Sequence, residues 1–363
     1  MRIIIKVGTN LLTRKDGALN IARVRNLAED ILSLRNNGCQ VVLVSSGAIG
    51  AGMGRLGLTK RPDELRAKQA LAAIGQPLLM HAYETVFSKL GITVAQVLLT
   101  RQDFDDRQRY INARNTLLAL LEYGAVPIIN ENDTVAVDEI KIGENDTLSA
   151  LVAAKIGADH LIIFTDVDGL YKGVPGKSEL IPVVEKITPE IEAYASGVSG
   201  SGKGVGGMIT KLSAAKIATT AGVRMTIANG GVSGVLRRIV DGEQVGTLFL
   251  PRKHLDARRC WIAFGARCRG RLIVDRGAVS PIVLKGKSLL PSGIVGVEGK
   301  FKPGDTVSVM SPDRREIARG LTNFSTEDIN LIKGKKTGDI RKVVPGAEYD
   351  EVIHRDNLIV LNS

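Results

Sequence analysis

Residues 3–9 read IIIKVGT, and this short apolar run ending in a glycine turn decides the fold. Similar runs follow at Val41–Ser45, Thr93–Leu98, Val126–Ile129 and His160–Thr165. Apolar runs of this length, rich in β-branched residues, are typical of strands that are buried on both faces. The first 260 residues are therefore predicted to contribute buried strands to a single sheet.

Amphipathic segments lie between these strands. Ile21–Asn36 places apolar side chains at helical spacing, and Gly38 follows as a stop signal. Arg109–Tyr123 shows the same pattern and is followed by Gly124. Strands that alternate with helices predict an α/β fold, with an open, mainly parallel sheet sandwiched by helices. Ligands of such sheets bind beyond the carboxyl ends of the strands.

The pattern changes after about residue 260. Short strands are predicted at 271–274, 294–297, 306–310 and 358–361, separated by turns such as Pro303-Gly304-Asp305. This spacing predicts a small β-rich domain, built as a barrel. We expect a first domain over 1–258, a linker over 259–269, the β-rich domain over 270–347, and a C-terminal extension, 348–363, that packs on it.

Composition narrows the class of protein. The chain has 363 residues, of which 44% are hydrophobic and 24% charged, as in ordinary globular proteins. No apolar run approaches the roughly 20 residues of a membrane span, and the N-terminus lacks the features of a secretory signal. Three cysteines are too few for a disulfide framework. The expected location is the cytoplasm, without a membrane partner.

The net charge of +11 is unevenly spread. Residues 261–363 carry 17 basic and 12 acidic side chains, and Arg252–Arg276 holds eight basic side chains against Asp256 and Asp275. A phosphate-bearing partner such as RNA fits this pattern, and so does a solvated basic surface.

Two glycine turns follow predicted strands. Lys6 stands in an apolar strand directly before Gly8, and a buried lysine is costly unless it is paired, so its position indicates a bound anion. After the second strand comes SSGAIGAG, residues 45–52. Small residues at such a junction let backbone N–H groups approach an anion at a helix N-terminus.

Polar clusters follow the later strands. The string Glu-Asn-Asp-Thr occurs at 131–134 and again at 144–147, and amides beside carboxylates suit a zwitterionic substrate. Residues 164–171, FTDVDGLY, add acceptors that suit a nucleotide's base or ribose, or water around Mg²⁺. Ordinary polar loops are the alternative for each string.

The segment 197–203, GVSGSGK, is similar to a P-loop but fails, because Gly204 stands where Ser or Thr is required. We interpret Gly204–Gly207 instead as a flexible lid before a helix that begins near Met208. Lys211 would then lie in the first turn, within reach of a phosphate. Two lysines held by an aspartate between them favour phosphoryl transfer, because the transferring group needs positioned cations.

Six of these strings, in this order, resemble the amino acid kinase family over residues 1–260. They are the lysine strand, SSGAIGAG, NENDTV, the second END cluster, FTDVDGLY and GVGGMITKL. Within the family, the resemblance implies ATP-dependent phosphorylation of the side-chain carboxylate of L-glutamate to L-glutamyl 5-phosphate, the first step of proline biosynthesis. Aspartate, acetylglutamate, carbamate and UMP are the alternative acceptors. The β-rich domain resembles a PUA domain at 270–278 and 290–294, which implies RNA binding as an alternative function.

The resemblance also implies roles for individual residues. Lys6 and Lys211 would stabilise the γ-phosphoryl group in transfer, and Asp146 would orient both lysines. Ser46, Asp133 and Asn145 would bind glutamate. ATP would be bound by Lys6, Thr165, Asp166, Val205, Gly206, Gly207, Met208, Ile209, Thr210 and Lys211. Mg²⁺ would bridge the phosphates, with no protein ligand assigned.

Partners are implied in the same way. The family suggests feedback inhibition by proline, assembly as a homodimer or homotetramer, and a downstream glutamyl-phosphate reductase that receives the unstable product. The PUA-like domain suggests RNA.

Overall fold

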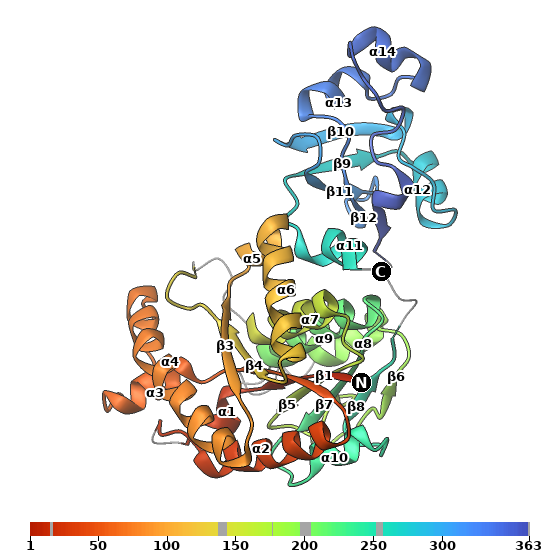
Figure 1. The fold of residues 1–363 in the computed structure, drawn as a ribbon. Coiled ribbons are helices and arrows are strands. Elements are labelled where there is room, and N and C mark those ends of the chain that lie inside the picture. The colour runs from red at the N-terminus through yellow and green to blue at the C-terminus, as the bar shows by residue number, and fades with distance from the viewer. Residues whose placement is uncertain (15–16, 137–143, 176, 197–204, 252–256, 362–363) are drawn as a thin grey trace. The chain divides into compact units, whose positions relative to one another are not determined.

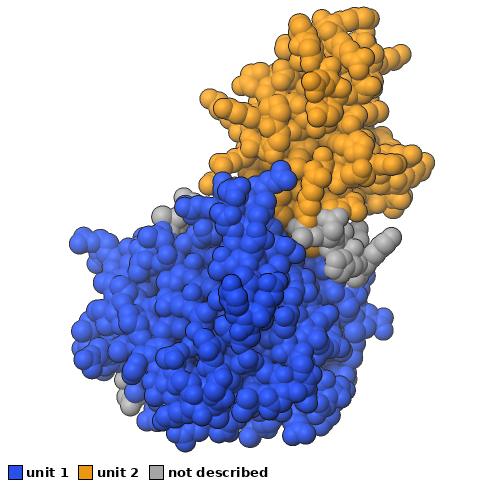
Figure 2. All heavy atoms as spheres, viewed as in Figure 1, with its two compact units in different colours: residues 1–257 blue, residues 258–363 orange. Residues whose placement is uncertain are grey.

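The computed structural model describes residues 1–14, 17–136, 144–175, 177–196, 205–251 and 257–361. The chain divides into two compact units, Met1–Ala257 and Arg258–Ser363 (Figure 2). The first contains a large, mainly parallel sheet with helices, and the second contains a sheet of its own. The fold class expected from the sequence is thus confirmed. None of the described helices is both long enough and apolar enough to cross a membrane.

The sheet of unit 1 has the strand order β3-β4-β2-β1-β5-β7-β8-β6. Its strands are β1 (Arg2–Val7), β2 (Gln40–Ser45), β3 (Val94–Leu99), β4 (Val126–Glu131), β5 (His160–Thr165), β6 (Val183–Val184), β7 (Arg224–Asn229) and β8 (Thr247–Phe249). Neighbouring strands are parallel except β7 and β8. The five strands predicted from the apolar runs are all present, with ends shifted by at most two residues.

Helices cover both faces of this sheet (Figure 1). They are α1 (Thr9–Leu12), α2 (Ile21–Asn36), α3 (Ala48–Arg55), α4 (Leu65–Phe87), α5 (Gln102–Asp105), α6 (Arg107–Glu122), α7 (Glu144–Ile156), α8 (Pro189–Ser196), α9 (Val205–Thr220) and α10 (Val235–Val240), with a 3₁₀ turn, η1, at Ser88–Leu90. Apolar side chains of α2, α4 and α10 pack on one face of the sheet in a single core. The helices α6, α7 and α9 lie over the other face.

Two helix boundaries show how local chemistry sets the ends. Helix α2 matches its predicted range, and Asn20 accepts a hydrogen bond from the backbone N–H of Arg23 at its start. Helix α6 begins earlier than predicted because Asp106 caps it, accepting from the N–H of Arg109 at 2.8 Å.

Glycines allow α3 and α4 to pack backbone against backbone. A Cβ at Gly75 would lie 1.8 Å from the carbonyl oxygen of Ala48, and a Cβ at Gly52 would lie 2.1 Å from that of Leu71. No side chain fits at such distances, so both positions require glycine. This close approach holds α4 against the glycine-rich turn that follows β2.

Unit 2 is built on the strand order β10-β9-β11-β12-β13. Its elements are α11 (Ala257–Cys260), the π-helical η2 (Trp261–Gly265), β9 (Gly270–Val274), α12 (Arg276–Val283), η3 (Pro291–Gly293), β10 (Ile294–Gly299), β11 (Thr306–Met310), β12 (Glu316–Leu321), α13 (Thr326–Ile332), η4 (Thr337–Asp339), α14 (Ile340–Val343), η5 (Arg355–Asn357) and β13 (Leu358–Val360). The predicted turn at Gly304 is present, with φ at +87°.

Both ends of unit 2 pack on its sheet. Strand β13, within the expected C-terminal extension, pairs with β12. The segment expected as a linker contributes the buried Ile262 and Ala263, and the Ala263 carbonyl accepts from Arg319 Nη1 at 2.8 Å. Residues 259–269 are therefore largely helical and belong to the folded unit.

A buried histidine links the stability of unit 1 to pH. His160 is 2% exposed, and its Nε2 lies 2.8 Å from Thr226 Oγ1. Burial, with the nearby charge of Arg224, lowers its pKa from 6.5 to about 3. The folded state therefore holds the ring neutral. Its contribution to stability is complete above pH 6.5 and is lost as the pH falls from 6.5 toward 3.

We expect wild-type stability to fall by about 2 kcal/mol between pH 7 and pH 5 through this residue, at about 1.4 kcal/mol per pH unit. In His160→Gln the decline should be absent over the same interval. Urea unfolding followed by circular dichroism is the appropriate measurement, because the single tryptophan lies in unit 2. Equal pH dependence in the two proteins would contradict the assignment.

Candidate active site

The carboxyl ends of four neighbouring parallel strands bring the predicted polar residues to one edge of the sheet. Lys6 on β1 lies opposite Val44 on β2 and Ile163 on β5. Strand β2 also pairs with β4, with Val44 opposite Ile129. The residues that follow in each strand are therefore neighbours at this edge, although they are far apart in the sequence.

Asp146 lies between two lysines. Its Oδ1 is 2.6 Å from Lys6 Nζ, and its Oδ2 is 3.2 Å from Lys211 Nζ. Thr210 Oγ1 lies 2.9 Å from the same Oδ2, and Lys211 Nζ also donates to the carbonyl of Gly207 at 3.1 Å. All three charged side chains are buried, with at most 10% exposure. The cluster carries one net positive charge at the sheet edge.

Burial and charge act against each other in this cluster. Burial alone would raise the pKa of Asp146, but the two ammonium groups outweigh it and hold that pKa below its usual value. Burial lowers the pKa of Lys6; the carboxylate of Asp146 opposes this shift, and the charge of Lys211 adds to it. The carboxylate of Asp146 is therefore ionised at neutral pH. It contacts the ammonium groups of both lysines, but its single negative charge neutralises only one of them.

The structure places the second Glu-Asn-Asp-Thr string in the first turn of helix α7, whereas the strand predicted before it lies outside the described residues. A second sequence interpretation needs correction. Residues Val205–Gly207, interpreted as part of a lid, form the first turn of α9, so Lys211 lies in the second turn rather than the first. The glycines adopt helical conformation there, and the Gly207 carbonyl accepts from Lys211. Gly204 and residues 197–203 lie outside the described residues.

Asn145 joins the glycine-rich turn to the end of β4. Its Nδ2 donates to Ser46 Oγ at 2.7 Å and to Asn130 Oδ1 at 3.0 Å. The turn itself depends on Gly47, whose φ of +110° favours glycine and which precedes helix α3. Two of the three residues expected to bind glutamate, Ser46 and Asn145, are thus in direct contact.

Asp133 lies in the turn after β4. Burial raises its pKa, and the positive charge of Arg61 opposes that shift. Among the described residues, the observed hydrogen bonds join Ser46 with Asn145 but do not include Asp133.

Thr165 is the last residue of strand β5, and Asp166 follows it directly. Burial would raise the pKa of Asp166, but hydrogen bonds from Asn10, its own backbone N–H and Thr165 outweigh burial and lower it. Asn10 Nδ2 lies 3.1 Å from Asp166 Oδ2. Asn10 was not predicted as a site residue, and nothing in its sequence context distinguishes it from other polar residues after a strand.

The remaining predicted ATP-binding residues lie along the start of α9. Thr210 is buried against Asp146, Ile209 is 45% exposed, and Met208 is half-buried. The side chain of Val205 lies outside the described structure. No group of three or more His, Cys, Asp or Glu side chains that would hold a metal occurs within the described part of the chain.

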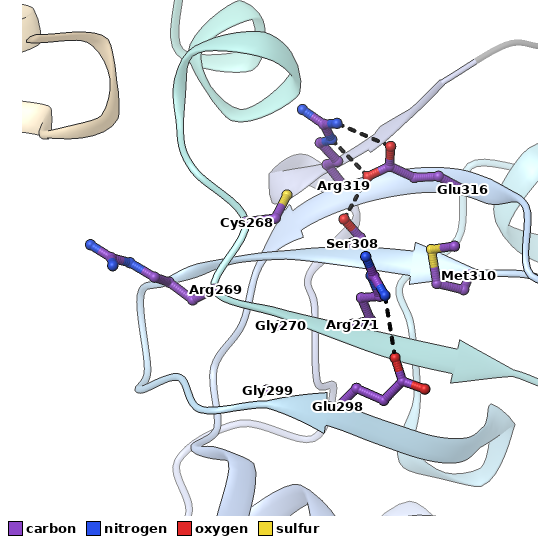
Figure 3. Close-up of a pocket in the computed structure, with 10 residues that line it drawn as sticks. All are labelled: Cys268, Arg269, Gly270, Arg271, Glu298, Gly299, Ser308, Met310, Glu316 and Arg319. Atoms are coloured by element: carbon purple, nitrogen blue, oxygen red, sulfur yellow. Dashed lines mark hydrogen bonds and ion pairs between the residues drawn. The ribbon is translucent and has the colours of Figure 1, made fainter. Parts of the chain in front are cut away.

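Unit 2 has a separate hollow of about 450 Å³ on its sheet (Figure 3). Two ion pairs line it: Arg271 with Glu298, and Arg319 with Glu316. Arg269 is exposed and points away from the other labelled side chains. The hollow is therefore nearly charge-balanced, with one arginine at its rim directed outward.

Comparison with known proteins gives two family matches. The model of the amino acid kinase family matches residues 1–229, and that of the PUA domain matches residues 270–344. The glutamate 5-kinase of Caldanaerobacter subterraneus subsp. tengcongensis is 53% identical, covering 99% of this chain and 98% of that protein. The glutamate 5-kinase of Moorella thermoacetica is 52% identical, covering 99% of this chain and 96% of that protein. The glutamate 5-kinase of Pelobacter propionicus is 48% identical, covering 99% of this chain and 97% of that protein.

Proposed function

This chain belongs to the amino acid kinase family, and we propose that it transfers the γ-phosphoryl group of ATP to the side-chain carboxylate of L-glutamate. The product is L-glutamyl 5-phosphate, and the step is the first of proline biosynthesis. The observation that carries the proposal is the buried ion cluster of Lys6, Asp146 and Lys211 at the carboxyl edge of the sheet. The name shared by relatives that align over nearly the whole chain supports glutamate as the acceptor.

The cluster suits this reaction because the chemistry needs cations more than a base. The side-chain carboxyl of glutamate has a pKa near 4.3 and is already ionised at neutral pH. One of its oxygens attacks the γ-phosphorus while the bond from that phosphorus to the β–γ bridging oxygen breaks, and ADP leaves. Lys6 and Lys211 stabilise the negative charge on the transferring group. Asp146 fixes both ammonium groups in advance, so little reorganisation is needed.

The remaining site residues complete the proposal. Ser46, Asp133 and Asn145 bind glutamate, with carboxylate and amide oxygens available to its ammonium group. Thr165, Asp166 and residues 205–211 of α9 bind ATP. Mg²⁺ accompanies ATP and neutralises charge on its phosphates when bound.

The acceptor is tested by supplying ATP with each candidate in turn: glutamate, aspartate, acetylglutamate, carbamate or UMP. Acyl phosphates are trapped with hydroxylamine as hydroxamates, and ADP is measured in parallel for the other acceptors. We expect hydroxamate and ADP in equal amounts with glutamate alone. Turnover with only UMP or only aspartate would contradict the proposal.

Several partners belong to the same proposal. We expect proline to act as a feedback inhibitor, a glutamyl-phosphate reductase to receive the reactive product, and the chain to form a homodimer or homotetramer. We place the enzyme in the cytoplasm, and we propose a kinase domain over 1–258 followed by a PUA domain over 270–347.

RNA binding by unit 2 is a second candidate function. The outward-pointing Arg269 at the rim of the hollow and the excess of basic residues over 261–363 favour it. Phosphate contacts make RNA affinity fall with salt, and losing one such contact lowers the slope of log K against log salt by about 1.

We expect the full chain to retain RNA at low salt and to release it at high salt, with a slope lower by about 1 in Arg269→Ala. Arg355→Ala serves as the control, because Arg355 lies in the same unit but outside the hollow. Filter retention measures binding at each salt concentration. A chain that ignores RNA at low salt would exclude this function.

A further inference from the structure

Three polar side chains of α4 point at the candidate glutamate site, at intervals of seven residues. Gln69 Nε2 donates to the carbonyl of Ala136 at 3.0 Å, in the segment that follows β4. Gln76 Oε1 accepts from Asn130 Nδ2 at 2.9 Å. The hydroxyl of Tyr83 lies 2.8 Å from Ser45 Oγ. Seven residues make nearly two helical turns, so all three lie on one face of the helix.

We infer that this face of α4 positions the glutamate-binding groups, and that Gln76 is the positioning residue that fixes the amide of Asn145. The inference rests on the proposed function. It assigns no contact between Gln76 and substrate, because Gln76 acts through Asn130.

The direction of the hydrogen-bond chain is fixed by a backbone group. The N–H of Glu131 donates to Asn130 Oδ1 at 2.9 Å, and a backbone N–H can only donate. Asn130 must therefore direct its oxygen toward Glu131 N and Asn145, and its Nδ2 toward Gln76. Gln76 in turn has to present an acceptor, as its Oε1 does.

The same direction determines what Asn145 offers to a substrate. Since Asn130 Oδ1 accepts from Asn145 Nδ2, that nitrogen is committed to Asn130 and Ser46. Asn145 Oδ1 is then left as a buried acceptor without a hydrogen-bond partner within the described structure. A buried acceptor of this kind suits a donor from the substrate, and the ammonium group of an amino acid is such a donor.

The position of Gln76 follows from the neighbouring glycine. Gly75 is in backbone contact with Ala48 of α3, so α4 is held against the turn that carries Ser46. Asn130 is 2% exposed, so solvent has little access to replace a missing acceptor at its Nδ2. Losing the Gln76 oxygen leaves a buried donor unpaired, and the amide of Asn130 is no longer held in one orientation.

The test compares three variants of the full chain by steady-state kinetics with ATP and glutamate. Gln76→Met removes the acceptor at similar volume and is expected to raise the KM for glutamate about tenfold, with the KM for ATP unchanged. Gln76→Glu keeps an acceptor oxygen and should remain within about twofold of wild type in both constants. Glu84→Met is the control, because Glu84 is exposed on the same helix.

Should Gln76→Met fail to fold, Gln76→Asn replaces it, since the shorter side chain withdraws the acceptor while staying polar; the same rise is expected. An unchanged glutamate KM, an equal rise in both KM values, or equal defects in Gln76→Glu and Gln76→Met would overturn the inference. Wild-type chain without glutamate-dependent ADP formation would instead overturn the proposed function, so the two failures are distinguishable.

Discussion

The Lys211→Ala variant is expected to lose about 100- to 1,000-fold in kcat with ATP and glutamate, the cost of removing one preorganised donor from a developing negative charge. Lys211 Nζ makes one contact with Asp146 and one with the Gly207 carbonyl, and an ammonium has three N–H groups. One N–H is thus left to face the transferring phosphoryl group. The fold should survive, because Asp146 keeps Lys6 as an ion-pair partner.

Lys216→Ala provides the matched control for this prediction. Lys216 lies on the same helix, and its side chain is half exposed and pairs with Glu192 at the surface. Exposed pairs contribute little, at most about 1 kcal/mol. Activity near wild type in the Lys211→Ala variant, with folding verified by circular dichroism, would show that the cluster does not stabilise the transferring group.

Asp146→Asn is expected to affect stability and activity together. The variant leaves Lys6 and Lys211 buried beside each other without their carboxylate, and breaking a buried pair costs about 3–5 kcal/mol. We expect unfolding free energy to fall by about 3 kcal/mol, measured by urea denaturation without substrate. We also expect kcat to fall by at least about 100-fold, because neither ammonium group is held in place.

A double variant separates the two effects of Asp146. Combining Asp146→Asn with Lys211→Met removes one of the two repelling charges, so part of the lost stability should return. Activity should not return, since a cation needed for transfer is also missing. Stability that does not recover, or activity that does, would contradict the role assigned to this carboxylate.

The sequence predicts the parts of unit 1 that depend on local pattern. The apolar runs predict five strands, and the spacing of apolar residues in Ile21–Asn36 predicts helix α2. In these segments the order of apolar and polar residues directly matches which side chains are buried. Helix α4 was not among the predicted elements. Its Gly75 and Pro77 are residues that usually mark a break, yet here Gly75 serves the close contact with α3.

The sequence also predicts some residues of the candidate site and misses others. Lys6 stands out in the sequence because it is a lysine within an apolar strand, directly before a glycine turn. The contact between Asp146 and Lys211, in contrast, spans 65 residues and depends on the packing of α7 beside α9. Gln76 and Asn10 could not be found from sequence, because their partners lie on other strands and loops. The start of α9 was misplaced because three glycines in four residues look like a loop.

The most direct test of carboxylate phosphorylation follows the oxygen atoms. Glutamate labelled with ¹⁸O in its side-chain carboxylate is incubated with the enzyme, ATP and hydroxylamine, and the released phosphate is examined by mass spectrometry. Hydroxylamine attacks the acyl carbon, so the bridging oxygen leaves with the phosphate. Our account predicts one ¹⁸O atom in each phosphate released, in amounts equal to the hydroxamate. Phosphate without label would mean that ATP is hydrolysed by water, and would contradict transfer to the carboxylate.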